Sequence, residues 1–322
     1  MNKYGFYDRL TEQFPSQIVV DLCNVCNYEC IHCPQSQYKK SDAFTGTYLS
    51  EEINKKLVDE AANDGAGMIQ QIRYTAAGEP LLHPKAIDML RYAVENSKTM
   101  VTLTTNGSLL TDEMSDELLD MNIGLIDFSL DAFKDETYAQ IRKKGDLKIV
   151  RERILDMLNK KKLKNSKTRI IVSFVEQEKN TSEKDEFKKY WEEHGIDFVV
   201  IRKCHSAGGF FYKENNKKRW IQPCVYPWER VAMDAKGNLS FCPASWLGKT
   251  VICRDYSKTT IKEVWNNKDY QQLRKEHLEN KFDKYKVCEE CPDRALIIWP
   301  ANRTDILRGY GDMIKDFSDK EG

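Results

Sequence analysis

The stretch "QIVVDLCNVCNYECIHCPQ", residues 17–35, joins a short β-branched strand to four cysteines that fall within eleven residues, Cys23, Cys26, Cys30 and Cys33. A four-thiolate zinc site usually joins two Cys-x-x-Cys pairs across a long insert. Here only three residues separate the two pairs, so all four thiolates can hardly wrap one small tetrahedral ion. We therefore expect an iron–sulfur cluster, because each of its irons takes a separate thiolate.

Strand and helix patterns alternate about six times from this start. The predicted strands are near-continuous apolar runs at 17–22, 69–75, 100–105, 125–130, 169–175 and 197–202, and such runs indicate strands covered on both faces. The alternation predicts parallel strands joined by crossover helices. Six units are too few for a closed eight-stranded barrel, so the predicted fold class is α/β, an open partial (β/α)6 TIM-like barrel. Its chemistry is expected at the carboxyl ends of the strands.

Composition narrows the classes of partner. The 322 residues carry 50 Lys+Arg and 50 Asp+Glu, and this balance predicts no nucleic-acid partner. No apolar run approaches the ~20 residues that cross a bilayer, and the N-terminus has no signal-peptide core. We therefore expect no membrane partner and a cytoplasmic location, where thiols stay reduced and clustered cysteines hold metal.

The spacing of Cys26, Cys30 and Cys33, with Asn27 after the first, resembles the signature of the radical S-adenosylmethionine (SAM) superfamily. The resemblance implies that these thiolates hold three irons of an oxygen-sensitive [4Fe–4S] cluster, while SAM binds the fourth iron. It also implies a flavodoxin- or ferredoxin-type electron donor and cleavage of SAM to a 5′-deoxyadenosyl radical, which takes a hydrogen atom from substrate. Cys23 lies outside the signature and is expected to be an unligated thiol. A structural zinc site is the alternative.

Other positions resemble the SAM pocket of that superfamily, in the order of the predicted strands. They lie in "AAGEP", where Ala77 replaces the usual first glycine, and in "TNG", "FSLDAF" and "QIRKKG". The resemblance implies a SAM pocket made by Gly78, Glu79, Asn106, Ser129, Asp131, Arg142 and, just before the third cysteine, His32. Ser129 and Asp131 also suit an ordinary turn, and Arg142 also suits an exposed helix surface.

A second cysteine set follows residue 223. Cys224, Cys242, Cys288 and Cys291 form the pattern Cys-x17-Cys-x45-Cys-x-x-Cys, which resembles the Twitch form of the SPASM domain. The resemblance implies that the four thiolates saturate one auxiliary [4Fe–4S] cluster, and four-thiolate zinc is the alternative. The predicted organisation is a lead (1–16), a radical SAM partial barrel (17–203), a linker (204–223), and an auxiliary-cluster domain with its tail (224–322).

Two reactions are compatible with this architecture. In the first, a radical carbon beside a hydroxyl loses a proton and passes an electron to the auxiliary cluster, which oxidises an alcohol to a carbonyl. In the second, a cysteine outside the clusters quenches the radical from the opposite face and inverts the centre. Cys204, after the sixth strand, and Cys253 are the candidate hydrogen donors, and a buried apolar thiol is the alternative for each.

The length of chain before the first strand gives an indirect indication of the substrate class. About sixteen residues precede the first strand, which is less than a leader-binding domain requires. We therefore expect a small metabolite, such as a sugar or aminocyclitol, or a short unaided peptide. An iron–sulfur electron carrier is the non-enzymatic alternative, but it would not need the SAM-pocket residues.

Overall fold

The computed structural model describes residues 11, 13–75, 77–211, 223–244 and 246–295. Most of the predicted lead, half of the predicted linker and the tail 296–322 therefore lie outside the described residues. Within the described part, no helix is both long enough and apolar enough to cross a membrane.

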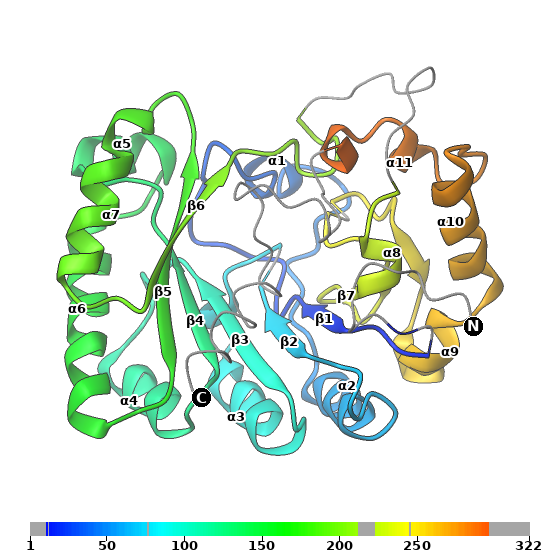
Figure 1. Cartoon of the computed structure of the whole chain (residues 1–322), viewed down its shortest axis with the longest axis horizontal. Coiled ribbons are helices and arrows are strands. Elements are labelled where there is room, and N and C mark those ends of the chain that lie inside the picture. Colours follow the sequence, from blue (N-terminus) through cyan, green and yellow to red (C-terminus); the bar gives the residue numbers. More distant parts are fainter. Residues whose placement is uncertain (1–10, 12, 76, 212–222, 245, 296–322) are drawn as a thin grey trace.

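One nine-stranded sheet organises the described residues, in the order β6-β5-β4-β3-β2-β1-β7-β8-β9 (Figure 1). β1 to β6 pair in parallel with their neighbours in chain order, which confirms the predicted open barrel of six strands. The strands are β1 (Gln17–Val20), β2 (Gln71–Tyr74), β3 (Met100–Thr105), β4 (Leu125–Ser129), β5 (Arg169–Glu176), β6 (Phe198–Lys203), β7 (Arg230–Met233), β8 (Leu239–Ser240) and β9 (Val251–Cys253).

Helices cover the outer face of the parallel strands, and a second group surrounds β7 to β9 (Figure 1). The helices are α1 (Gln35–Tyr38), α2 (Glu51–Asn63), α3 (Ala86–Asn96), α4 (Asp112–Asp120), α5 (Asp135–Ile141), α6 (Leu147–Lys164), α7 (Lys184–Glu193), α8 (Tyr226–Glu229), α9 (Ile261–Trp265), α10 (Lys268–Glu279) and α11 (Lys286–Glu289). Side chains cap the N-termini of several helices, including α2 and α4. Ser50 Oγ accepts from Ile53 N at 3.3 Å, and Thr111 Oγ1 accepts from Met114 N at 3.2 Å, satisfying amides that the helix leaves unpaired.

The two faces of the parallel strands differ in chemistry. Outward side chains such as Ile18, Ile72 and Phe128 are buried in the main hydrophobic core beneath the helices. Because side chains alternate along a strand, the intervening positions face the barrel interior. These include an apolar group of Leu125, Ile171 and Val200, and a set of polar residues described below.

The sheet continues into the C-terminal part of the chain. β7 pairs in parallel with β1, so that Gln17 lies opposite Arg230 and Val20 opposite Met233. β7, β8 and β9 then form antiparallel pairs, and Gly237 supplies a φ of +77° in the β7–β8 turn, a conformation that favours glycine. We call residues 223–295 the auxiliary unit. The barrel and this unit share one sheet, and the division predicted between them stays a prediction.

Candidate functional site

Three of the four N-terminal cysteines lie together on the loop after β1. Burial raises the pKa of the Cys26 thiol to about 12, and Cys30 and Cys33 add smaller increases. Burial also raises the pKa of Cys33, to about 11. Among the described residues, no three His, Cys, Asp or Glu side chains are close enough to hold a single metal ion. Three neighbouring thiols on one loop, each on a separate residue, fit a cluster that takes one thiolate per iron.

Cys23 has different surroundings. Its Sγ donates to the carbonyl oxygen of Glu79 at 3.2 Å and has a second contact with that of Val25 at 3.4 Å, and the residue is only 1% exposed. Burial raises the pKa of this thiol to about 12. These contacts hold Cys23 as a buried hydrogen-bonding thiol, and the prediction that it is not a cluster ligand stays a prediction.

Gly78 brings the loop after β2 against the cysteine loop. A Cβ at this position would lie 2.3 Å from the Cys23 carbonyl oxygen and 2.5 Å from that of Val25, so only glycine fits. The next residue, Glu79, donates its N–H to Val25 O at 2.8 Å. The two loops are thus joined through backbone atoms.

The Glu79 carboxylate ties this loop to the end of β3. It accepts from Thr105 Oγ1 at 2.6 Å, Leu81 N at 3.2 Å and Asn106 N at 2.8 Å. Burial raises its pKa. The Asn106 side chain donates to Asn27 Oδ1 at 2.9 Å, so the predicted pocket residue Asn106 contacts the cysteine loop. Asn27 was assigned no role beyond its place after Cys26 in the signature, and that place was the only signal for it.

Asp131, Arg142 and His32, three predicted pocket residues, form one buried cluster. Asp131 Oδ2 accepts from Arg142 Nε at 2.9 Å and Nη2 at 2.6 Å, and lies 3.3 Å from His32 Nε2. Arg142 Nη1 is 3.8 Å from Cys30 Sγ, which joins the cluster to the cysteine loop. The structure therefore excludes the alternative in which Arg142 is a surface charge.

Burial and charge determine the protonation of this cluster. Burial lowers the pKa of His32 to about 4, against the opposing effect of Asp131, so the imidazole is neutral near pH 7. Its Nδ1 lies 3.2 Å from Gln177 Nε2, a contact that no sequence motif indicated. Asp131 raises the pKa of Arg142 despite burial, so the guanidinium keeps its charge. Ser129, the remaining predicted residue, ends β4 opposite Ser173 of β5, two positions before Asp131.

The second cysteine set also comes together. Burial raises the pKa of Cys288, and Cys224, Cys242 and Cys291 each raise it further. The other three thiols are thus electrostatic neighbours of Cys288. Cys224 and Cys242 flank β7 in the chain, and the other pair spans the end of α11. The donor set fits an auxiliary cluster with one thiolate for each iron.

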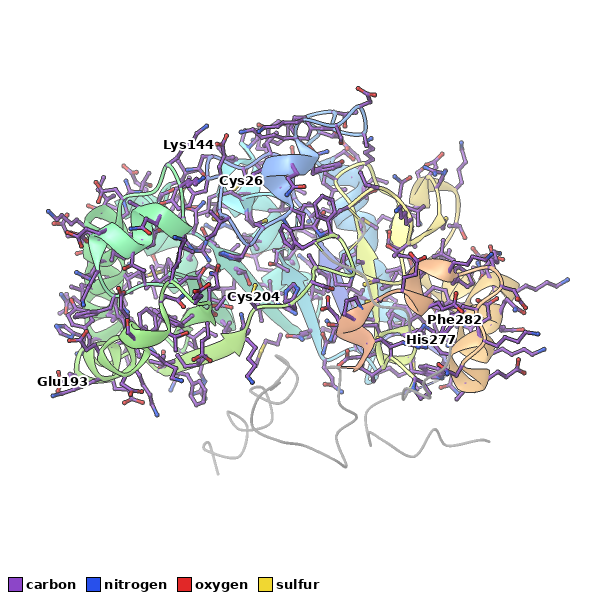
Figure 2. All side chains as sticks on the ribbon, turned by 90° about the horizontal axis from the view of Figure 1, so that it is seen from above. Cys26, Lys144, Glu193, Cys204, His277 and Phe282 are labelled. Carbon is purple, nitrogen blue, oxygen red and sulfur yellow. The ribbon has the colours of Figure 1, made fainter. Side chains whose placement is uncertain are left out.

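Cys204 lies between the two cysteine sets. It follows β6 directly, and burial raises its pKa, with further increases from Asp131 and Asp293. Asp131 belongs to the buried cluster described above, and Asp293 lies two residues after Cys291. Figure 2 shows Cys26 and Cys204 in the middle of the molecule, between Glu193 and His277. Cys204 follows the sixth strand as expected, and its role as a hydrogen donor stays a prediction.

Cys253 lies elsewhere. It is the last residue of β9. Burial and the nearby charge of Asp255 raise the pKa of the Cys253 thiol, and the charge of Lys56 in α2 lowers it. It packs partly buried against the core beneath the helices. These neighbours place the thiol on the α2 side of the sheet.

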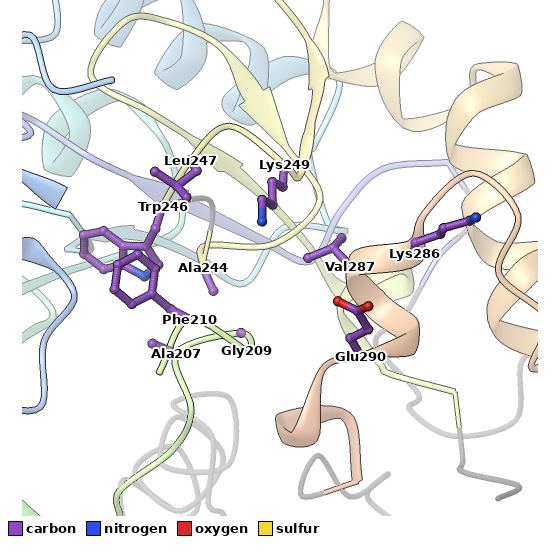
Figure 3. Close-up of a pocket in the computed structure, with 11 residues that line it drawn as sticks. Ala207, Gly209, Phe210, Ala244, Trp246, Leu247, Lys249, Lys286, Val287 and Glu290 are labelled. Atoms are coloured by element: carbon purple, nitrogen blue, oxygen red, sulfur yellow. The ribbon is translucent and has the colours of Figure 1, made fainter. Parts of the chain in front are cut away.

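Two cavities border the auxiliary unit. One of about 260 Å³ lies between the loop after β6, with Phe210, and the segment around Val287 and Glu290 (Figure 3). The other, of about 210 Å³, is lined by Asp21 and Asp234, which follow β1 and β7. Burial raises the pKa of Asp21, and Asp234 adds to the increase.

Known proteins resemble the chain along most of its length. In sequence it is 24% identical over 187 residues to the tungsten-containing aldehyde ferredoxin oxidoreductase cofactor-modifying protein of Pyrococcus furiosus, covering 57% of this chain and 50% of that protein. The chain thus spans about half the length of this curated relative. In structure it resembles BtrN in complex with AdoMet and 2-DOIA, with a TM-score of 0.57 and 18% identity over 88% of this chain and 94% of BtrN.

A second structure, Streptococcus suis SuiB bound to precursor peptide SuiA, gives a TM-score of 0.65 and 14% identity over 89% of this chain and 71% of SuiB. The model of the radical SAM superfamily matches residues 20–183, about half of the chain, and that of an iron–sulfur cluster-binding domain, SPASM, matches residues 224–292. The chain therefore belongs to the radical SAM superfamily and carries a C-terminal SPASM domain.

Proposed function

We propose that this radical SAM enzyme oxidises an alcohol carbon of a small sugar-like or aminocyclitol metabolite to a carbonyl. One hydrogen atom, and then one proton and one electron, leave the H–C–O–H unit of the substrate. The bound cofactors supply the hydrogen-atom acceptor, derived from SAM, and the one-electron acceptor, the auxiliary cluster. A flavodoxin- or ferredoxin-type protein is the proposed electron donor.

The residues on the cysteine loop and around it would hold the first cofactors. Cys26, Cys30 and Cys33 are the proposed ligands of the SAM-binding cluster. The proposed SAM contacts are Gly78, Glu79, Asn106, Ser129, Asp131, Arg142 and His32. Because Arg142 reaches both Asp131 and Cys30, it would orient the bound groups while compensating thiolate charge.

The observation that carries the oxidative proposal is the second cysteine set. Cys224, Cys242, Cys288 and Cys291 are mutual electrostatic neighbours, and four thiolates leave no iron open for substrate. A fully ligated cluster suits electron transfer. The likeness to BtrN, solved with 2-DOIA and covered over 94% of its length, supports a small substrate. The likeness to SuiB, solved with its precursor peptide, supports a short peptide as the other substrate class.

Cys204 favours a second candidate, epimerisation. Its thiol is near Asp131 and Asp293, and the exposed residue is not part of either proposed ligand set. A thiol that donates a hydrogen atom to the opposite face of a substrate radical would need this kind of position. Cys253, on the α2 side of the sheet, lacks such neighbours and is the weaker donor candidate.

Anaerobic reconstitution tests the cofactor assignments. We expect about eight irons per chain, four for each cluster, and about four would overturn the two-cluster proposal. Cys26→Ala should abolish reductive cleavage of SAM, whereas the matched change Cys23→Ala should leave it within a fewfold of the parent. Equal cleavage by the two variants would refute the division of the cysteines.

Turnover in deuterated water separates the two reactions. Oxidation should consume one SAM for each carbonyl formed and leave no deuterium on the reacting carbon. Epimerisation should place deuterium on that carbon without net oxidation, and Cys204→Ala should then abolish product formation while SAM cleavage continues.

A further inference from the structure

Arg294 places a positive charge inside the auxiliary unit. It lies in the short 3-10 helix Pro292–Ala295, which begins directly after Cys291. The residue is only 2% exposed, whereas an arginine is almost never fully buried unless a partner compensates its charge. Because a guanidinium keeps its proton in proteins, this charge needs a partner in the auxiliary unit.

Two donor atoms of this guanidinium are left unsatisfied. Nε and Nη1 of Arg294 are buried and have no hydrogen-bond partner among the residues that the structure describes. Burial lowers the pKa of Arg294, and the charged groups that oppose this shift are three thiols of the second cysteine set, on Cys288, Cys224 and Cys291, and then Glu289. Buried donors without an acceptor are costly and rare, so the two N–H groups indicate an acceptor that the protein alone does not supply.

A series of contacts connects Arg294 to the second cysteine set. The guanidinium carbon lies 4.6 Å from the centroid of the Phe282 ring, a cation–π contact that uses none of the N–H donors. Phe282 packs edge-on against His277, with 5.0 Å between the ring centroids, and the two lie side by side in Figure 2. His277 Nδ1 in turn accepts from Cys224 N at 3.3 Å. Arg294 is thus held near Cys224 by packing and near Cys291 by the chain.

A second arginine near these thiols shows how a compensated charge looks in the same unit. Arg230 also favours the thiolate of Cys224, but it pairs with Glu229, whose Oε2 accepts from Arg230 Nε at 2.8 Å. Arg294 favours the thiolates of Cys288 and Cys291 against the effect of burial. The anions beside its unsatisfied donors are therefore the proposed ligands of the auxiliary cluster themselves.

We propose that Arg294 donates hydrogen bonds from Nε and Nη1 to sulfur atoms of the auxiliary cluster and raises the reduction potential of that cluster. Reduction adds one electron to a thiolate-bound cluster, and hydrogen bonds to sulfur and a nearby positive charge stabilise the more negative state. The cluster is then a better acceptor for the electron that leaves the substrate radical. This inference rests on the proposed function only in giving the auxiliary cluster that role, and Arg294 is a positioning residue that does not touch the substrate.

A redox titration followed by EPR spectroscopy tests the proposal in the reconstituted enzyme with both clusters. The auxiliary cluster gives the signal that addition of SAM leaves unchanged. At the midpoint potential of the parent, Arg294→Gln should lower the ratio of reduced to oxidised auxiliary cluster about tenfold, which is a shift of ~59 mV for a one-electron couple. An unchanged midpoint potential in Arg294→Gln would overturn the proposal.

A matched variant and a measurement on the parent complete the test. Arg254→Gln removes the same charge from an exposed position of the auxiliary unit, where water and salt screen it, and an equal shift in this control would overturn the proposal. If Arg294→Gln does not assemble the auxiliary cluster, pulsed EPR of the parent with ¹⁵N-labelled arginine decides. The ¹⁵N coupling to the auxiliary signal should be present in the parent and lost in Arg294→Lys, which keeps the charge without the guanidinium fork. Its absence from the parent would overturn the proposal.

Potential and reaction fail separately in this design. A lowered potential in Arg294→Gln, in an enzyme whose parent gives no carbonyl product on turnover, would refute the oxidative function and leave the role of Arg294 standing. Carbonyl formation by the parent, with equal auxiliary midpoint potentials in the parent and in Arg294→Gln, would refute the role of Arg294 and leave the oxidative function standing.

Discussion

The buried ion pair between Asp131 and Arg142 can be broken by one nearly isosteric change. Asp131→Asn removes the negative charge and keeps the shape of the side chain. Asp131 has a φ of +64°, and asparagine tolerates that left-handed conformation well. The backbone therefore need not move. The change removes the charge and one acceptor, because Asp131 Oδ1 accepts from Val175 N at 2.6 Å and Oδ2 accepts from Arg142.

The expected loss follows from burial. The side chains of Asp131 and Arg142 are 0% and 9% exposed, with 2.6 Å between Oδ2 and Nη2. Removing one partner of such a pair leaves a buried charge without compensation and costs about 3–5 kcal/mol. The melting temperature should then fall by about 4–7 °C, because the entropy of unfolding is about 2.1 cal/mol/K for each residue of this 322-residue chain.

An exposed pair of the same length provides the control. Arg91 Nη2 and Glu117 Oε2 are also 2.6 Å apart, but the side chains are 35% and 46% exposed. Arg91→Gln should cost less than about 1 kcal/mol, because water screens the pair. Anaerobic scanning calorimetry would measure both variants, and SAM affinity would be titrated alongside. Equal melting temperatures for the two variants, with unchanged SAM affinity in Asp131→Asn, would refute the reasoning.

Three further predictions concern the loops around the two cysteine sets. Gly78→Ala should weaken SAM binding by tenfold or more, measured by titration, because its Cβ would clash with the Cys23 carbonyl. Glu276→Gln should destabilise the protein by about 1–3 kcal/mol in calorimetry, since the carboxylate accepts from the backbone N–H groups of Lys284 and Tyr285, and exposed Glu279→Gln is its control. Hydrogen bonds lower the pKa of Glu276 despite burial, so its contribution is present above pH 4.5 and is lost as pH falls below that value. Removal of iron with a chelator should raise amide hydrogen exchange in residues 224–292 more than in α6.

Each of these three predictions has its own control or contradicting outcome. Gly67→Ala, at a φ of +75° with no atom within 4 Å of the added Cβ, carries backbone strain without a clash and should leave SAM affinity unchanged. An unchanged pH profile in Glu276→Gln would contradict the role given to that carboxylate. Uniform exchange after iron removal would show that the auxiliary unit does not depend on its metal.

Local patterns predicted most of the barrel. The apolar run 100–105 is β3 at the same bounds, because six consecutive residues favour a strand covered on both faces. The parallel pairing of the remaining barrel strands was predicted from the alternation of strand and helix patterns along the chain. The pairing of β7 with β1 was not predictable in the same way, because β7 is a strand of only four residues and its partner is more than 200 residues away in the chain.

The site was predictable to the extent that its residues stand next to a motif. Asp131 and Arg142 were found through their flanking sequence, and the structure joins them. Arg73 and Arg202 were not singled out, because a single arginine in an apolar strand carries no spacing signal. Arg73 in β2 and Arg202 in β6 are far apart in the sequence, and they become electrostatic neighbours only when both strands curve around the same interior.

The register between β1 and β7 determines how the two cysteine sets are held relative to each other. β1 leads directly into the loop with Cys26, and β7 lies between Cys224 and Cys242 in the chain. The two strands pair over four residues in register, so both sets are attached to neighbouring strands of one sheet. A slip of one residue would turn Arg230 and Ala232 from the interior to the outer core, which would bury a charge among Ile18, Val20 and Leu22. The cost of that misplacement keeps the register, and through the register the paired strands β1 and β7 hold the two proposed cluster sites relative to each other.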